Sequence, residues 1–189
     1  MQNMLAYTIQ GSNYSGSVPY IVIGQGATKQ WVNPQAPQDD SYWIAILDRT
    51  TPGKVVKDFV IPGSNNSSVP AGLDTYMSNP AYIFALVTQH LSTLHVPQGD
   101  FYDYLAKYGA GRALQRLEQL NTSLGCGSIS GMSYLLTGQC GPRGNGIPSP
   151  PSYELGSYQN PVLLTMSLMP LSNGQPPYSI CDHNTFLTR

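Results

Sequence analysis

The stretch YWIAIL (residues 42–47) is followed by DRTTPG (residues 48–53) and then by KVVKDFVI (residues 54–61). A short, nearly continuous apolar run is typical of a β-strand buried on both faces. Pro and Gly follow it in the order that forms a tight turn, and the next apolar run reads as the returning strand. These residues therefore predict a β-hairpin whose first strand lies in the interior.

Outward from this hairpin, further apolar runs bounded by turn residues predict additional strands. They lie at residues 5–9, 20–23, 81–87, 132–137 and 161–169. Residues 141–151 are rich in Pro and Gly and have no periodicity, so they predict a surface loop. The chain after Pro170 is expected to be irregular.

Two segments have helical character. Residues 70–78 predict a short helix that ends before Pro80. Residues 99–120 carry apolar side chains at intervals of three and four and predict one amphipathic helix. Gly109 and Gly111 weaken its middle, where a kink or a close approach to the sheet is expected.

The composition of the 189-residue chain is that of one globular domain with a weakly charged surface. Charged residues make up 10% of the chain, against about 25% in an average soluble domain. No cluster of Lys and Arg favours nucleic acid, and no apolar stretch approaches the ~18 residues of a membrane span. The first residues also lack the pattern of a secretory signal peptide. A neutral surface rich in Tyr and Asn suits uncharged contacts with glycans or with permanent protein neighbours.

The three cysteines do not form a disulfide framework, and their odd number leaves at least one unpaired within the chain. Cys126 and Cys140 are 14 residues apart around a predicted turn and strand, and they are a possible disulfide if oxidised. The alternative is that the cysteines are buried free thiols.

The residues that most resemble a catalytic cluster are His90, His95 and Asp100, with Asp103 one helical turn further on. Imidazoles and carboxylates can bind a metal ion or act as acid and base. The two histidines, however, lack the four-residue step that places both on one helix face, and capping of the helix by Asp100 is the preferred explanation. The sequence also contains no G-x-S-x-G elbow and no phosphate-binding glycine fingerprint. We therefore expect no enzyme activity, no metal and no cofactor.

The order of these parts resembles that of the ILEI/PANDER-like domain family over about residues 41–172. The resemblance rests on the hairpin, the two following helical segments, YLLTGQCGPRG (residues 134–144) and PVLLTMSLMPLS (residues 161–172). It implies a compact α/β sandwich of mixed or antiparallel sheets with two helices and Pro/Gly-rich loops. Outside this range, residues 1–40 are expected to form an N-terminal β-rich arm or added strands, and residues 173–189 an irregular C-terminal tail.

The resemblance also implies a position for a sugar site. Family members that bind N-acetylglucosamine use an Asp in the loop after the second buried strand and a Trp-Arg-Asp run before the next strand. Here these positions fall near Gln89 and His90 and near Ser130, and the charged and aromatic pair is absent. Gln89 and His90 would then supply hydrogen bonds, with Tyr134 as an aromatic platform.

Together these observations predict a non-catalytic recognition module that binds a glycan or other protein subunits. We expect it to be an oligomer or part of an assembly, either a virion tail or fibre or a bacterial cell surface. One alternative is a purely structural virion subunit without a ligand. The other is a hydrolase that uses His90, His95 and Asp100.

Overall fold

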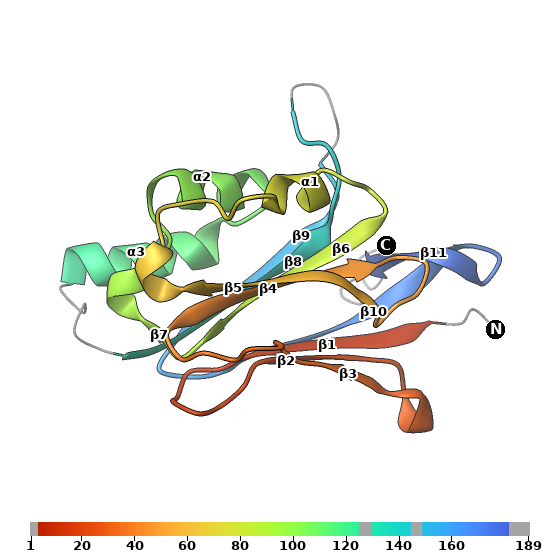
Figure 1. Ribbon diagram of the computed structural model, residues 1–189, viewed down its shortest axis with the longest axis horizontal. Helices are drawn as coiled ribbons and strands as arrows, with labels where there is room; N and C mark the ends of the chain where they lie inside the picture. Colours follow the sequence, from red (N-terminus) through yellow and green to blue (C-terminus); the bar gives the residue numbers. More distant parts are fainter. Residues whose placement is uncertain (1–3, 125–129, 145–148, 182–189) are drawn as a thin grey trace, which may run out of the picture.

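The structure is a computed structural model that describes residues 4–124, 130–144 and 149–181, and these are arranged in three layers (Figure 1). Helices cover one face of a central β-sheet, and a second sheet, here called the outer sheet, covers its other face. The strands of both sheets pair with antiparallel neighbours. The predicted α/β sandwich is confirmed, and its sheets are antiparallel.

The central sheet has the order β5-β4-β6-β8, and β7 and β9 also pair with β8. Its strands are β4 (Ser41–Asp48), β5 (Val55–Pro62), β6 (Tyr82–Gln89), β7 (Leu91–Ser92), β8 (Ser130–Gln139) and β9 (Ser152–Tyr158).

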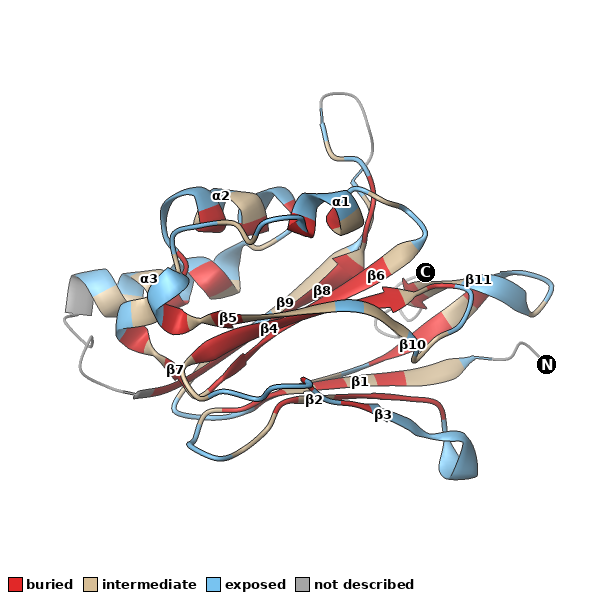
Figure 2. Ribbon diagram, viewed as in Figure 1, coloured by how far each residue is buried: buried red, intermediate tan, exposed pale blue. Residues whose placement is uncertain are grey.

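Strand β4 is buried on both faces, as the sequence predicts. Side chains that alternate along a strand point to opposite faces. Tyr42, Ile44 and Ile46 accordingly pack in the core beneath the helices. Trp43 and Leu47 pack in the second core, between the two sheets. Figure 2 shows this burial along the middle layer.

The outer sheet has the order β11-β10-β1-β2-β3. Its strands are β1 (Leu5–Gly11), β2 (Tyr20–Ile23), β3 (Gln30–Val32), β10 (Val162–Ser172) and β11 (Gln175–Cys181). The sheet therefore combines residues from before the hairpin with residues from the end of the described chain.

This pairing changes the predicted division of the chain. Strand β1 pairs with β10 over seven residues, so residues 1–40 supply added strands of the outer sheet, the second of the two alternatives, and are not a separate arm beside a domain of residues 41–172. Strand β11 pairs with β10, so the expectation of an irregular tail at residues 173–189 is wrong for Gln175–Cys181. The core between the two sheets therefore depends on strands from outside the range of the family resemblance, whereas the core beneath the helices lies within it.

The described residues contain three α-helices rather than two: α1 (Leu73–Met77), α2 (Gly99–Lys107) and α3 (Arg112–Leu124). The single helix predicted for residues 99–120 is divided because the chain turns at Gly109, where φ is +102°. A Cβ atom there would collide with Ser152 Oγ, so only glycine fits this turn. None of the described helices is long and apolar enough to cross a membrane.

Helix α3 lies against β9, a strand that the sequence did not predict. The Glu154 carboxylate of β9 accepts hydrogen bonds from the backbone N–H groups of Ala113 at 2.8 Å and Leu114 at 3.4 Å, at the start of the helix. Two residues further along β9, a Cβ on Gly156 would lie 2.9 Å from Leu117 Cδ1. The first turns of the helix therefore pack close to the strand.

Candidate functional site

The predicted contact residue Gln89 ends β6 and is 4% exposed. Its Nε2 donates a hydrogen bond to Asp39 Oδ1 at 3.1 Å, and its backbone lies opposite Ser41 of β4. The side chain is engaged inside the protein and offers little surface to a ligand.

His90 and Ser130 are close to each other, as the sequence reasoning required. His90 interrupts the strand between β6 and β7 with a φ of +45°, and its backbone N–H donates to Ser12 O at 2.9 Å. The backbone of Ser130 pairs with Ser92 in β7. A Cβ on Gly131 would lie 3.8 Å from His90 Cδ2, so the start of β8 borders this half-buried ring.

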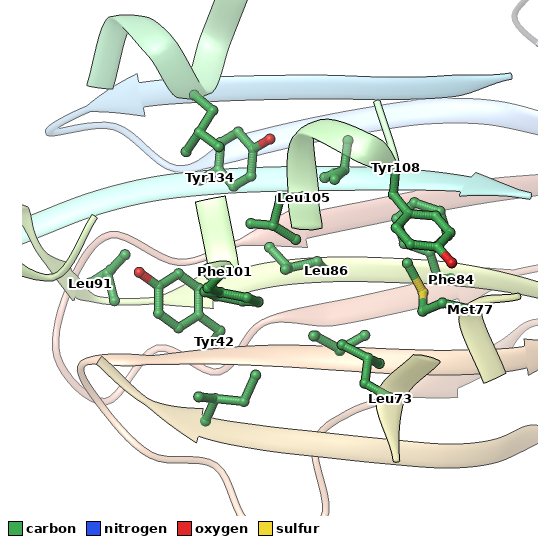
Figure 3. Close-up of a cluster of buried hydrophobic side chains, with 14 of the residues drawn as sticks. Tyr42, Leu73, Met77, Phe84, Leu86, Leu91, Phe101, Leu105, Tyr108 and Tyr134 are labelled. Carbon is green, nitrogen blue, oxygen red and sulfur yellow. The ribbon is translucent and has the colours of Figure 1, made fainter. Parts of the chain in front are cut away.

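Tyr134 is not an exposed platform, and this prediction is wrong. Its ring is completely buried in the core beneath the helices, as Figure 3 shows, and its hydroxyl lies 3.0 Å from Glu154 Oε2 as a hydrogen-bond donor. Gln89 lies on the other face of the sheet by strand alternation, since Val87 packs between the two sheets. The two residues therefore do not face one ligand.

Asp39 is a residue that the sequence analysis did not identify at this end of the sandwich. Its carboxylate accepts hydrogen bonds from Ser15 Oγ, from the Gly16 backbone N–H at 3.2 Å and from Gln89 Nε2. These contacts, that from Ser15 foremost, hold the pKa of Asp39 below its usual value. Asp39 thus connects the β1–β2 loop with the end of β6.

The carboxylate that pairs with His95 is that of the neighbouring Asp40 and not that of Asp100, which the hydrolase hypothesis named. Asp40 Oδ2 lies 2.7 Å from His95 Nδ1, while Asp40 Oδ1 accepts the Ser92 backbone N–H at 2.9 Å. The Asp40 carbonyl also accepts a hydrogen bond from Gly63 N at 2.6 Å. Asp100 is exposed in the first turn of α2, whose N-cap residue is Gln98, so Asp100 is not the cap that the sequence predicted.

No group of three or more His, Cys, Asp and Glu side chains within residues 4–124, 130–144 and 149–181 could hold a metal ion. In the same residues Cys140 is a buried free thiol and Cys181 a half-buried one. Burial raises the pKa of Cys140 to about 12, so its thiol is unreactive at neutral pH. The possible disulfide to Cys126 involves a residue outside the described ranges.

The open face of the outer sheet, turned away from the central sheet, presents a different kind of surface, here called the outer face. Strand register aligns its side chains in two rows across neighbouring strands. The first row consists of Trp31, Val22, Thr8 and Thr165, and the second of Tyr20, Gln10 and Leu163.

This face carries an aromatic pair, the exposed Trp31 and the half-buried Tyr20. Trp31 is 61% exposed, and its ring centroid lies 5.1 Å from that of Tyr20, with the planes inclined at 57°. The Tyr20 hydroxyl donates to Gln10 Oε1 at 2.6 Å, which fixes the tyrosine ring. The pair borders a shallow groove of about 350 Å³, which Thr8, Gln25 and Lys29 also line.

The turn between β2 and β3 positions this groove. Gly24 has a φ of +98°, and a Cβ there would lie 2.7 Å from Thr28 O. The Thr28 backbone N–H and hydroxyl both donate to Gln25 O, at 3.1 and 2.7 Å. The tight connection leaves Trp31 opposite Val22 on the next strand.

The sequence contained a signal for this surface that the analysis did not use. Side chains in β2 and β3 point alternately between the two sheets and to the outer face, where Val22 is nevertheless only 8% exposed. Ile21, Ile23 and Val32 pack between the sheets, so Tyr20 and Trp31 must face outward.

Comparison with protein-family models and with curated proteins finds no match for this sequence.

Proposed function

We propose that this protein is a non-catalytic recognition module that binds an uncharged glycan on the outer face. The observation that carries the proposal is the exposed Trp31 ring held against Tyr20 beside a shallow groove. A large indole left in water forfeits the free energy that burial would supply, so a ligand that covers it gains that energy.

The chemistry of the face suits a sugar chain. An aromatic ring can cover the apolar side of a pyranose, and polar groups of Thr8, Gln25 and Lys29 can bind hydroxyls. A row across four strands is about 14 Å wide, which accommodates a short oligosaccharide. Of the residues that line the groove, Lys29 has the one charged side chain, so a neutral ligand fits better than a polyanion.

The Trp31→Ala variant tests this proposal. Truncation of a central aromatic contact costs about 2 kcal/mol, so we expect at least a tenfold loss of affinity for any glycan that the native protein binds. A glycan array would identify the ligand, and isothermal titration calorimetry would measure the affinity of both proteins.

Tyr14→Ala is the matched control, because Tyr14 is 62% exposed but lies in the β1–β2 loop, outside the groove. The control is expected to bind as the native protein does. Equal binding by Trp31→Ala and the native protein, or no binding to any glycan, would contradict the proposal.

The same experiment addresses the alternative of a purely structural subunit in a virion or cell-surface assembly. In that case another protein chain covers the outer face, and Trp31→Ala weakens assembly rather than sugar binding. Light scattering after size-exclusion chromatography would separate the two, with Tyr14→Ala again as the control.

A hydrolase remains the second candidate, and the His95–Asp40 pair is the observation that favours it. A carboxylate at 2.7 Å from Nδ1 can orient an imidazole as a general base. Asp40 also accepts hydrogen bonds from Ser92 and Gly63, which instead favours a structural role in which it holds neighbouring loops together. Hydrolysis of chromogenic esters or glycosides that His95→Ala abolishes would favour catalysis, and a native protein without activity would exclude it for those substrates.

A further inference from the structure

A second surface, distinct from the outer face, lies between α3 and β9. It is a groove of about 740 Å³ lined by both elements. Leu117 and Leu120 of α3 and Leu155 and Tyr158 of β9 supply its apolar lining. Figure 1 shows α3 beside the central sheet on the side of β9.

Two arginines give the groove a positive charge. Arg112 and Arg116 are both exposed and line the groove one helical turn apart. The ion pairs of the described residues are those of Lys54 with Asp48 and His95 with Asp40, so neither arginine has an acidic partner there.

The one carboxylate in the lining does not neutralise these arginines. Glu154 accepts bonds from the first backbone N–H groups of α3, and its Oε2 also accepts one from the Tyr134 hydroxyl. The charge of Glu154 is thus directed at the helix terminus, where it is favourable.

Strand β9 also lies at the edge of the central sheet. It pairs with β8 over all seven of its residues, and no other strand of the described residues pairs with it. Every second residue of such a strand directs its backbone N–H and C=O groups away from its partner. Charged side chains on edge strands often prevent pairing with another chain. The one charged residue of β9, Glu154, binds the start of α3 instead.

We propose that this groove binds an extended acidic peptide segment of a partner protein, which adds to the edge of β9 as a further strand. Backbone hydrogen bonds to β9 hold the peptide, and its carboxylates pair with Arg112 and Arg116. Apolar side chains on its other face cover the partly exposed Leu155.

The spacing of the groups supports this geometry. Helix α3 runs along β9, because Ala113 contacts Glu154 and Leu117 approaches Gly156. Four residues of a helix rise about 6 Å, and two residues of a strand rise about 6.6 Å. Acidic residues at alternate positions of an added strand therefore match Arg112 and Arg116. A second copy of this chain fits less well, since pairing two β9 edges would bring four arginines together.

The test uses a fluorescein-labelled hexapeptide of alternating Glu and Val, titrated with the full chain and followed by fluorescence anisotropy. We expect the double variant Arg112→Gln/Arg116→Gln to lose at least tenfold in affinity, and Arg112→Lys/Arg116→Lys to lose less. Lys29→Gln is the matched control for removal of an exposed cation elsewhere, and Trp31→Ala separates this site from the outer face. Both are expected to leave peptide binding unchanged.

Strand addition has its own readout. Two peptides, each N-methylated on one of the two alternate sets of amides, should differ in their affinity for the protein, because only one set faces β9. Methylation of the set that faces β9 is expected to abolish binding. Native protein that does not bind the peptide, equal affinity for a Lys/Val peptide, or indifference to both methylation patterns would overturn the proposal. Self-association through the groove, detected by light scattering and lost in Arg112→Gln/Arg116→Gln, would also overturn it in favour of a second copy.

Discussion

At the residue scale, Asp39 holds together segments that are distant in the sequence. It accepts hydrogen bonds from Ser15 and Gly16 in the β1–β2 loop and from Gln89 at the end of β6. This carboxylate therefore joins the end of the outer sheet to the end of the central sheet, together with the backbone hydrogen bonds of Ser12 to Thr88 and His90.

The lowered pKa of Asp39 predicts a dependence of stability on pH. A carboxyl group whose pKa is lower in the folded state stabilises that state when ionised. Its contribution is complete above its pKa in the unfolded chain, near pH 4, and is lost as the pH falls through the folded pKa. At pH 7 we expect Asp39→Asn to lower the free energy of unfolding by about 1 kcal/mol, with solvent screening allowed for. The difference should shrink on acidification.

Urea denaturation of both proteins at several pH values between 7 and 3 would measure this difference. Asp103→Asn, at an exposed position of α2, is the control and should show a much smaller effect at pH 7. A deficit of Asp39→Asn that grows on acidification would contradict the assignment.

The sequence placed His90 near the start of β8 but could not show how the side chains around it are used. Gln89 is polar and follows a buried strand, which resembles a loop contact until its bond to Asp39 is seen. Tyr134 looked like a possible platform, whereas strand alternation places it in the core. Such assignments depend on which face of the sheet each residue occupies, and a one-residue change in position reverses that face.

At the element scale, the start of α3 depends on a residue of β9 rather than on a capping residue of its own. Glu154 accepts the first free N–H groups of the helix, and its negative charge is favourable at a helix N-terminus. Helix and strand therefore stabilise each other although about forty residues separate them.

Glu154→Gln tests this dependence. The variant keeps the size of the side chain but loses its charge and one acceptor oxygen, so we expect the free energy of unfolding to fall by about 1–2 kcal/mol. Chemical denaturation followed by circular dichroism would measure it. Glu118→Gln, within α3 itself, is the control and should change stability by less than about 0.5 kcal/mol.

The elements with strong local patterns were predictable, and those that depend on distant partners were not. The apolar run of β4 identified it as a buried strand, and Gly109 marked where the long helix is divided. Strand β9 has Glu154, Gly156 and two serines among seven residues, so no hydrophobic pattern reveals it. It forms because β8 offers an edge and α3 covers one of its faces.

At the scale of the whole molecule, the outer sheet joins segments from both ends of the described chain. Strand β1 lies between β2 and β10 and contributes the fully buried Tyr7 and Ile9. The sequence suggested a boundary near residue 40 because the clearest signals begin at Ser41. That boundary cannot separate folding units, since pairing of β1 with β10 is a long-range event that local patterns do not encode.

Removal of residues 1–40 is therefore expected to prevent cooperative folding of the remaining chain. The truncation uncovers the side of the central sheet that carries Trp43 and Leu47. We expect binding of the dye ANS, weak near-UV circular dichroism and a broad thermal transition. A truncated protein with a sharp transition and native near-UV spectrum would instead show that residues 41–189 fold alone.

The pairing of β1 with β10 also determines when the outer sheet can form during synthesis on the ribosome. Leu5 pairs with Leu168, which is 163 positions later in the chain. At ~5–20 residues per second, translation of the residues between them takes about 8–33 s. The nascent chain can form the hairpin of β4 and β5 early. The apolar face of this hairpin that packs against the outer sheet stays exposed to water until β10 leaves the ribosome. We therefore expect the yield of this protein in a cell to depend on the chaperones that shelter an unfinished chain.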